Sequence, residues 1–437
     1  MEVKNKNYCG TIVKINTLVP IENSDNIQHA IIMGNSVIVD KKTYVGDVGI
    51  YFPLETQLSK EYLKRNNLYR NGNLNDDITK KGYFEENGRI RCVKLRGNKS
   101  EGLYMPLSSI KSFYEDAENL PEGEDFDTLN GIEICKKYIP KEVRTPGLSG
   151  SKNKKGRSPK EEKLLPGQFK FHSDTGMLYK NMHRFNLGTF IDISYKMHGT
   201  SAIVSYILCN KKLKWYEKIL KKLGVNIVDS EYDYIYSSRK VIKSEELNSG
   251  QNSYYSEDIW KITSEKLKPF LQKGMTFYYE VVGFLPNGAY IQKDYDYGYE
   301  AKEHGIYIYR ITYTNIDGKV FEYSAHQVKE FCIKHGLNSV DSLFQGTVAQ
   351  FIHYANDSTL VNLSYGPNDI LDCFLSKVKE FYNEHNCYMC NNTVPEEGCV
   401  VRIEGLEFEA YKQKSNRFYE RETKNLDLGE VNIEDEN

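Results

Sequence analysis

The stretch Lys196-Met197-His198-Gly199-Thr200-Ser201 decides the fold, because it joins two runs of strand-forming residues. Residues 189–195 (TFIDISY) predict a strand that leads into Lys196, and residues 201–207 (SAIVSYI) predict the strand that leaves the loop. Lys196 is therefore expected on a tight connection between two strands. Alone, the segment establishes little, because the chain holds 58 lysines and arginines, most of which face water, and Gly199-Thr200 also fits an ordinary turn.

Five later segments add residue types that suit one chemistry. Glu280 and Glu397 adjoin apolar residues, where an unpaired charge is costly, so each needs a cation or a donor. Lys412 and Lys414 are two apart and would point to the same side of a strand, toward one phosphate. Tyr309 can stack on a purine, although a core role is commoner for a tyrosine. The segments are Ser237-Ser238-Arg239, Tyr278-Tyr279-Glu280-Val281-Val282-Gly283, Ile306-Tyr307-Ile308-Tyr309-Arg310, Glu397-Gly398-Cys399-Val400-Val401-Arg402 and Ala410-Tyr411-Lys412-Gln413-Lys414.

Together these residues indicate nucleotidyl transfer through a lysine. A lysine amine attacks the α-phosphorus of a nucleoside triphosphate only when it is deprotonated, and neighbouring positive charge or desolvation lowers its pKa. Lys412, Lys414 and a divalent cation are candidate sources of that charge. Phosphoryl transfer rests on positioning and charge neutralisation, so the site needs carboxylates for the metal and cations for the phosphates. The sequence predicts a lysyl-N-phosphoramidate at Lys196, with pyrophosphate as the leaving group.

The first hundred residues predict a small β-barrel of the OB type. Short apolar and β-branched runs at 10–15, 29–33, 36–40, 49–52 and 90–96 alternate with turn signals. In the last run Lys94 and Arg96 fall on one face of the sheet, with Lys99 nearby, where they could follow a phosphate backbone. A solvated sheet face explains them about equally well.

The chain of 437 residues is long enough for two domains, and its composition changes along its length. We expect an OB-fold nucleic-acid-binding domain at 1–120, a connector at 121–165 with a basic linker, an α+β domain at 166–425 and an acidic tail at 426–437. The linker at 145–159 is rich in Gly, Ser and Lys, so flexible reach is its first expected role. Helices are expected at 211–223, 258–271, 325–337, 347–354 and 371–383.

Composition narrows the class of protein. With 58 basic and 60 acidic side chains the chain is almost neutral, so a nucleic-acid surface must be a local patch. No apolar run is long enough for a signal peptide or a membrane span, so we expect a cytoplasmic, monomeric protein without a membrane partner, of a cell or of a virus or phage in its host. The nine cysteines favour reduced thiols. Cys387 and Cys390 form a C-x-x-C pair, but without a second close pair zinc is the weaker interpretation.

The ordered segments resemble the covalent nucleotidyltransferase superfamily of ATP-dependent ligases and mRNA capping enzymes, whose first motif is often Lys-x-Asp-Gly. His198 stands where that aspartate does, and Lys-x-His-Gly-Thr is instead similar to nick-sealing RNA ligases. Only 23 residues follow Lys414, too few for the C-terminal OB domain of DNA ligases and capping enzymes. An N-terminal barrel resembles the Deinococcus/Naegleria type of RNA ligase, and so does the segment 169–175, to which chemistry gives no role.

The resemblance implies a fold, a reaction and a set of roles. The fold would be α+β, with an N-terminal OB-type barrel and a C-terminal adenylyltransferase (ATP-grasp-like ligase) domain of antiparallel sheets and helices. The enzyme would be an ATP-dependent RNA ligase that uses Mg²⁺ or Mn²⁺ and seals 3′-hydroxyl/5′-phosphate nicks in duplex RNA or RNA/DNA hybrid, with Lys196 adenylylated. ATP-binding residues would be His198, Gly199, Arg239, Glu280, Tyr309, Glu397, Lys412 and Lys414.

Within this scheme two carboxylates would also hold the metal, Glu280 and Glu397. RNA would contact Thr200, Lys94 and Arg96. Two alternatives stay open: a GTP-dependent, capping-type guanylyltransferase, and a catalytically silent RNA-binding protein.

Overall fold

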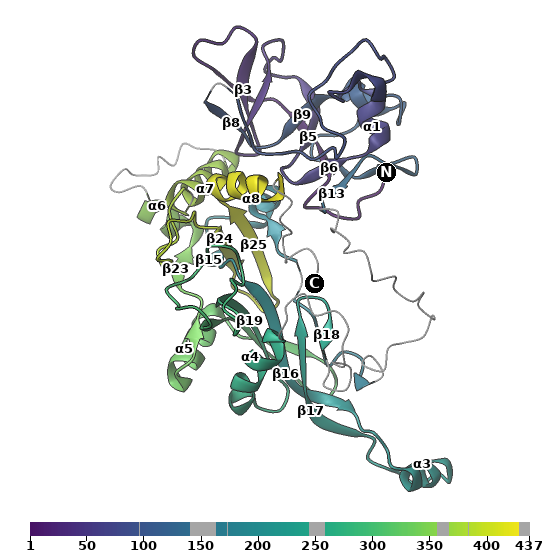
Figure 1. Ribbon diagram of the computed structural model, residues 1–437, viewed down its shortest axis with the longest axis vertical. Coiled ribbons are helices and arrows are strands. Elements are labelled where there is room, and N and C mark those ends of the chain that lie inside the picture. Colours follow the sequence, from purple (N-terminus) through teal and green to yellow (C-terminus); the bar gives the residue numbers. More distant parts are fainter. Residues whose placement is uncertain are drawn as a thin grey trace.

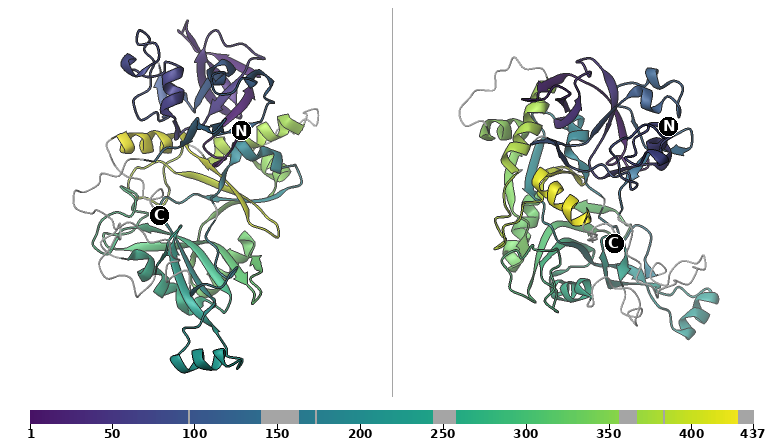
Figure 2. Two further views of the ribbon diagram at one scale, coloured as in Figure 1. Left: turned by 90° about the vertical axis from the view of Figure 1, so that its right-hand side faces the viewer. Right: turned by 45° about the horizontal axis from the view of Figure 1, so that its top comes forward.

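The computed structural model describes residues 1–95, 97–139, 163–172, 174–243, 258–355, 367–382 and 384–427. A smaller β-rich domain at the N-terminus sits on a larger domain built around two sheets (Figure 1). Views from two further directions show the same two-part arrangement and a hairpin that projects from the larger domain (Figure 2). This is the expected α+β class, with a barrel first and mainly antiparallel sheets after it.

The N-terminal domain folds around Ile12, Ile50 and Phe52, all fully buried. These residues come from alternating positions of strands whose other face is also covered, which is why the runs are nearly continuously apolar. Its sheets are β1 (Gly10–Lys14), β5 (Val48–Phe52), β9 (Leu103–Pro106) and β10 (Asp125–Phe126); β2 (Thr17–Pro20), β3 (Ile27–Ile32) and β4 (Asn35–Asp40); β6 (Thr56–Leu58) with β13 (Cys135–Lys137); β7 (Val93–Leu95) with β8 (Asn98–Ser100); and β11 (Thr128–Leu129) with β12 (Ile132–Glu133). Its helix is α1 (Lys60–Arg65).

Two expectations for this domain need correction. The boundary expected at residue 120 is too early, because β10 pairs with β1 and β13 pairs with β6, so the domain continues to Lys137. Phe126 is fully buried in the same core, which explains why these short strands belong there. The expected strand 90–96 shortens to Val93–Leu95, since Ile90 is instead buried in the core.

The larger domain contains a seven-stranded sheet, which includes the strand that leaves the Lys196 loop. Its central strand β19 is buried at every residue, between β16 and β20. Trp260 and Phe277 fill the core beneath it. The strands are β16 (Thr200–Asn210), β17 (Ser230–Ser238), β18 (Ile242–Lys243), β19 (Met275–Gly283), β20 (His304–Thr314), β21 (Val320–Glu322) and β22 (Asn338–Ser339).

A second, five-stranded sheet lies across from the first. Its order is β14-β25-β24-β15-β23, and Ile191, Ile193 and Val401 pack from it onto helices α6 (Val348–Ala355) and α7 (Pro367–Tyr382). The strands are β14 (Gly176–Met177), β15 (Phe190–Tyr195), β23 (Ser342–Thr347), β24 (Gly398–Ile403) and β25 (Glu409–Lys414). Lys196 lies where the chain passes from β15 in this sheet to β16 in the other, so the predicted strand–loop–strand is confirmed.

The expected helices form, with shifted ends. They are α3 (Trp215–Lys222), α4 (Ile259–Leu267), α5 (Ala325–His335), α6 (Val348–Ala355) and α7 (Pro367–Tyr382). A further helix, α8 (Asn416–Asp427), was not expected; it ends the larger domain, and residues 428–437 of the expected acidic tail lie outside the described residues. Among the described residues, no helix combines the length and apolar character needed to cross a membrane.

Side chains of α8 and of the short helix Leu178–Arg184 join the domains. Lys180 donates to Thr11 Oγ1 at 3.0 Å and contacts the sulfur of Cys9 at 3.1 Å, and its side chain is 6% exposed. Lys99 of the barrel pairs with Glu420 of α8 at 3.0 Å. Lys99 is therefore committed to the domain contact and is not simply an open phosphate ligand.

Candidate active site

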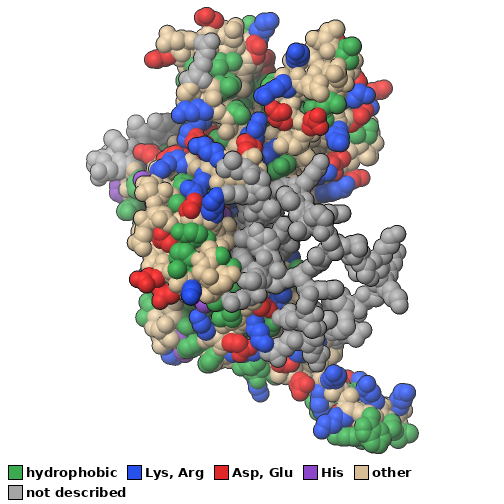
Figure 3. Space-filling model, viewed as in Figure 1, with side chains coloured by type: hydrophobic (Ala, Val, Ile, Leu, Met, Phe, Trp, Pro, Cys, Tyr) green, Lys and Arg blue, Asp and Glu red, His purple; other side chains and the backbone are tan. Residues whose placement is uncertain are grey.

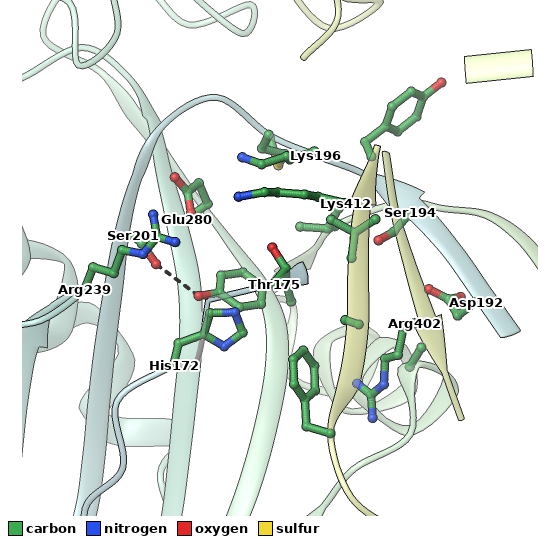
Figure 4. Close-up of a pocket in the computed structure, with 18 residues that line it drawn as sticks. His172, Thr175, Asp192, Ser194, Lys196, Ser201, Arg239, Glu280, Arg402 and Lys412 are labelled. Atoms are coloured by element: carbon green, nitrogen blue, oxygen red, sulfur yellow. Dashed lines mark hydrogen bonds between the residues drawn. The ribbon is translucent and has the colours of Figure 1, made fainter. Parts of the chain in front are cut away.

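A cavity of about 130 Å³ lies between the two sheets, beneath the Lys196 loop. Figure 4 shows Lys196 and Lys412 side by side at one end and Arg402 toward the other, with Arg239, Glu280 and His172 on the opposite side of the cavity. The cavity thus has a cationic end suited to phosphates and an aromatic end suited to a base. Its lining includes His172, Thr175, Asp192, Ser194, Lys196, Ser201, Arg239, Glu280, Tyr309, Arg402, Phe408 and Lys412.

The Lys196 loop is fixed by its backbone. Lys196 N–H donates to the carbonyl of Gly398 at 2.9 Å, and the amide of Gln292 donates to the carbonyl of Gly199 at 2.8 Å. A Cβ on Gly199 would stand 2.3 Å from the carbonyl oxygen of Val281, so no larger residue fits without moving the loop. The glycine of the motif therefore serves close packing of the loop on β19.

Lys196 is held by a buried carboxylate. Its Nζ lies 2.7 Å from Glu397 Oε1, and Lys414 Nζ lies 3.3 Å from the same oxygen. The Glu397 side chain is 0% exposed, against 15% for Lys196. Burial, then the charges of Cys387 and Glu397, raises the pKa of the adjacent Glu396 to about 9. The negative charge of this pair of glutamates is thus expected on Glu397, between two lysines.

His198 faces away from the cavity lining. Its ring stands edge-on to Tyr295 and Phe418, each 4.8 Å away between centroids, and its Nδ1 lies 3.6 Å from Glu397 Oε2. Its backbone N–H donates to the hydroxyl of Tyr297 at 2.6 Å. His198 therefore supports the loop and Glu397, and its expected contact with the nucleotide stays a prediction.

Glu280 and Arg239 enter from the seven-stranded sheet. Glu280 pairs with Ser201 across β19 and β16, and it is 9% exposed at the cavity wall. Arg239 follows β17 and donates to Asp174 Oδ1 at 2.6 Å. Burial would raise the pKa of Asp174, but the charges of Arg239 and Lys240 lower it overall. The cationic end of the cavity therefore contains carboxylates as well as lysines, as a metal–phosphate site requires.

Tyr309 lies in the wall with two residues that hold it. Its hydroxyl is 3.0 Å from the hydroxyl of Ser201, and its ring is edge-on to His172 at 5.2 Å. Arg310 donates to Nδ1 of His172 at 3.4 Å and is paired with Glu322. Burial, and then the charge of Arg310, lowers the pKa of His172 to about 3. Since arginine only donates, Nδ1 is the acceptor and the neutral ring carries its proton on Nε2.

Lys412 and Lys414 occupy alternate positions of β25, as their spacing predicts, and both are largely buried. Lys412 lines the cavity, whereas Lys414 turns toward Glu397 and toward Glu422 of α8, 3.8 Å away. The two lysines therefore share a side of the strand but have different first partners.

Sequence reasoning missed the other end of the cavity. Asp192 of β15 pairs directly with Arg402 of β24, and Asp192 accepts from Gln345 at 2.9 Å. Burial raises the pKa of Asp192 and lowers the pKa of Arg402. His172 was present only in a segment noted for its resemblance. Apolar strands interrupted by a charged residue were the available signal for Asp192 and Arg402.

The residues expected to contact RNA differ in how exposed they are. Thr200 is 4% exposed at the start of β16, and its contact with RNA stays a prediction. Lys94 is exposed on β7, and Arg96 lies outside the described residues. Cys387 and Cys390 are free thiols, and within the described residues no three metal-binding side chains come together.

Comparisons with known proteins agree with this architecture. A family model described as an OB-fold domain matches residues 9–107. No curated protein matches the chain in sequence.

Solved structures of Naegleria gruberi RNA ligase are similar over both domains. A mutant with ATP and Mn has a TM-score of 0.56 at 16% identity, covering 94% of this chain and 98% of that chain. A mutant with AMP and Mn has a TM-score of 0.54 at 15% identity, with 94% and 98% covered. The ligase with PPi has a TM-score of 0.55 at 15% identity, with 95% and 98% covered. The chain thus has the two-domain fold of the Naegleria RNA ligase, beginning with an OB fold.

Proposed function

We propose that the protein is an ATP-dependent RNA ligase that works through a lysyl-AMP intermediate at Lys196. One observation supports the proposal most strongly. Residues from separate segments between positions 196 and 414 surround one cavity and the buried carboxylate of Glu397. The Naegleria ligase, whose structures contain ATP, AMP or PPi, lends support through its fold.

In the first step Lys196 Nζ attacks the α-phosphorus of ATP, a P–N bond forms, and the P–O bond to pyrophosphate breaks. The amine must first lose a proton, and Glu397 Oε1, 2.7 Å from Nζ, is within reach to accept it. Lys412 then offers its charge to the α-phosphate from beside Lys196 (Figure 4). Tyr309 offers a face on which the adenine stacks.

In the later steps the AMP passes from Lys196 to a 5′-phosphate, and a 3′-hydroxyl then displaces AMP to form a phosphodiester. We propose nicked duplex RNA, or RNA paired with DNA, as the substrate, bound by a monomer through the barrel and Lys94. Of the expected RNA contacts that the structure describes, Thr200 is the less accessible, because it is buried.

The carboxylates suit a hard divalent cation. Mg²⁺ and Mn²⁺ accept oxygen ligands and keep several waters, so one or two carboxylates with phosphate oxygens suffice. Glu280 at the cavity wall and Glu397 beside Lys196 are the proposed holders. When bound, the cation neutralises phosphate charge and orients the pyrophosphate leaving group.

The test is covalent labelling with α-labelled ATP or GTP, followed by sealing of a nicked RNA duplex. We expect label from ATP, its release by pyrophosphate, and none in Lys196→Ala, whose folding is checked by circular dichroism. Label from GTP alone would replace the ligase by a guanylyltransferase. Absence of label from either nucleotide in the folded protein would favour a silent RNA-binding protein.

A further inference from the structure

The hairpin β16–β17 projects from the body of the protein and carries α3 at its end (Figures 1 and 2). We call residues 211–229 the arm tip. The two strands pair over nine consecutive positions, from Ala202 with Ser238 to Asn210 with Ser230. Tyr206 and Tyr234 stack at 4.4 Å on this stalk. The arm tip is therefore held out on a paired β-ribbon.

The arm tip has an apolar face that stays exposed among the described residues. Trp215, Leu223 and Val228 are 74%, 73% and 74% exposed, and no residue of α3 is buried. Along the helix the apolar residues share one side, since Trp215, Ile219 and Leu223 are spaced by four. An apolar stripe of this kind normally packs onto the body of its own protein, so its exposure here calls for an external partner.

Lysines surround that apolar face. The arm tip contains six lysines against Glu217 and Asp229, in a chain whose net charge is −2. Glu217 is paired with Lys211 at 2.8 Å and Asp229 with Lys221 at 2.6 Å. Lys218 and Lys222 are exposed and make no ion pair with any described residue. Figure 3 shows the apolar side chains together at the end of the arm, with basic side chains beside them.

We propose that the arm tip docks on the surface of an anionic phospholipid bilayer. Trp215 and the aliphatic side chains enter the interfacial region, while the lysines contact the negatively charged headgroups. This is a peripheral contact, and it departs from the expectation that the protein has no membrane partner. It is independent of the proposed ligase reaction.

The pattern favours lipid over other occupants. A nucleic acid would satisfy the lysines but would leave Leu223 and Val228 in water, because its backbone offers charge and its bases offer only stacking. A second copy of the arm would bring lysines against lysines. The arm tip is a projecting end and not a groove, which suits insertion into a soft surface.

The stalk gives this docking a geometric consequence. β16 begins directly after the Lys196 loop, and β17 ends at Ser238, next to Arg239. With about 3.3 Å per residue, the strand would keep the cavity on the order of 30 Å from the headgroups. A substrate could therefore reach the cavity while the arm tip is bound.

The test uses the full-length protein with phosphatidylcholine vesicles that contain or lack phosphatidylserine. We expect co-sedimentation only with the anionic vesicles, and a blue shift of tryptophan emission. Trp215 is the reporter, because the only other tryptophan, Trp260, is 1% exposed. At about 1 kcal/mol per lysine near an anionic surface, Lys218→Gln with Lys222→Gln should weaken partitioning by about 25-fold.

A second variant tests the apolar face. Trp215→Ser with Leu223→Ser should weaken partitioning by at least about ten-fold at high salt, where the lysine contribution is screened. Both positions are exposed, so folding and covalent labelling by ATP should be unchanged. A matched control is Lys424→Gln, a charge removed far along the chain, which should bind like the wild type.

Three results would overturn the proposal. One is equal sedimentation with neutral and anionic vesicles or with neither. Another is anionic binding that both arm variants retain. The third is tight binding of duplex RNA that depends on Lys218 and Lys222 but is indifferent to Trp215 and Leu223.

Discussion

Replacing Glu397 by glutamine tests the buried charge cluster on which the proposed chemistry depends. The substitution keeps the shape of the side chain and removes its charge. The carboxylate now lies 2.7 Å from Lys196 and 3.3 Å from Lys414, with 0% of its side chain exposed. At an effective dielectric constant of about 20, these attractions are roughly 6 and 5 kcal/mol before the cost of desolvation.

The net loss should be smaller. Removing one partner of a buried ion pair costs about 3–5 kcal/mol, because an uncompensated charge remains. Lys196 is 15% exposed and can turn into the cavity, so we take about 3 kcal/mol for Glu397→Gln. For a domain of this size that is roughly 6–12 °C in Tm.

The assay is a double-mutant cycle by thermal unfolding, with Lys196→Met as the second change. If the pair is coupled, Glu397→Gln should cost at least about 1 kcal/mol less when Lys196 is already methionine. In the labelling assay the single variant should lose at least about 100-fold in AMP transfer. Equal cost of Glu397→Gln in both backgrounds would refute the energetic pairing.

Three further substitutions probe the loop, the base end and the domain contact. Gly199→Ala should keep the protein folded but reduce AMP transfer by more than about ten-fold, since the Cβ of the alanine would lie 2.3 Å from the carbonyl oxygen of Val281. Unchanged labelling would contradict the packing role of the glycine. The pKa of His172 is lowered to about 3 in the folded protein, so the neutral ring stabilises the fold fully above the unfolded-state pKa near 6.5 and less as pH falls. By pH 5 the free energy of unfolding of the wild type should fall by about 1–2 kcal/mol relative to His172→Gln, and parallel pH profiles of Tm would exclude this. Lys180→Met should weaken the contact between the domains by about 1–3 kcal/mol, because Asp125 loses its partner at 3.5 Å. Proteolysis in the connector should then be faster, and an unaltered rate would argue against the contact.

Several features followed from sequence because local chemistry determines them. Lys196 had to lie on a loop, since apolar β-branched runs flank it, and β15 and β16 end and begin there. Lys412 and Lys414 had to share a side, because a strand repeats every two residues. Lys414 meets Glu397 because β24 pairs with β25, and it meets Glu422 because of the placement of α8, whereas Lys412 lines the cavity; no local pattern specifies these contacts.

Other features depend on contacts between distant segments. Helix α8 is mostly polar, and only Phe418 and Thr423 are buried, so its sequence offers few apolar residues from which to predict it. It forms because Phe418 packs against His198 and Glu422 meets Lys414. The pairing of Asp192 with Arg402 likewise arises from strand register, which the spacing of either segment does not reveal.

The histidine at position 198 now has a physical explanation. Its ring lies between Tyr295 and Phe418, with Nδ1 3.6 Å from a carboxylate oxygen of Glu397. An aspartate would place a second negative charge in this buried aromatic setting. At about 5 Å and an effective dielectric constant of about 20, the repulsion is about 3 kcal/mol.

We therefore expect His198→Asp to lower Tm more than His198→Asn, the neutral control of similar size, by an amount equivalent to about 2–3 kcal/mol. Because the repulsion needs Glu397, the difference between the two variants should largely disappear in the Glu397→Gln background. Equal stability of His198→Asp and His198→Asn would contradict the explanation. In this chain the imidazole avoids a second negative charge beside Glu397, whose own charge holds Lys196 in position.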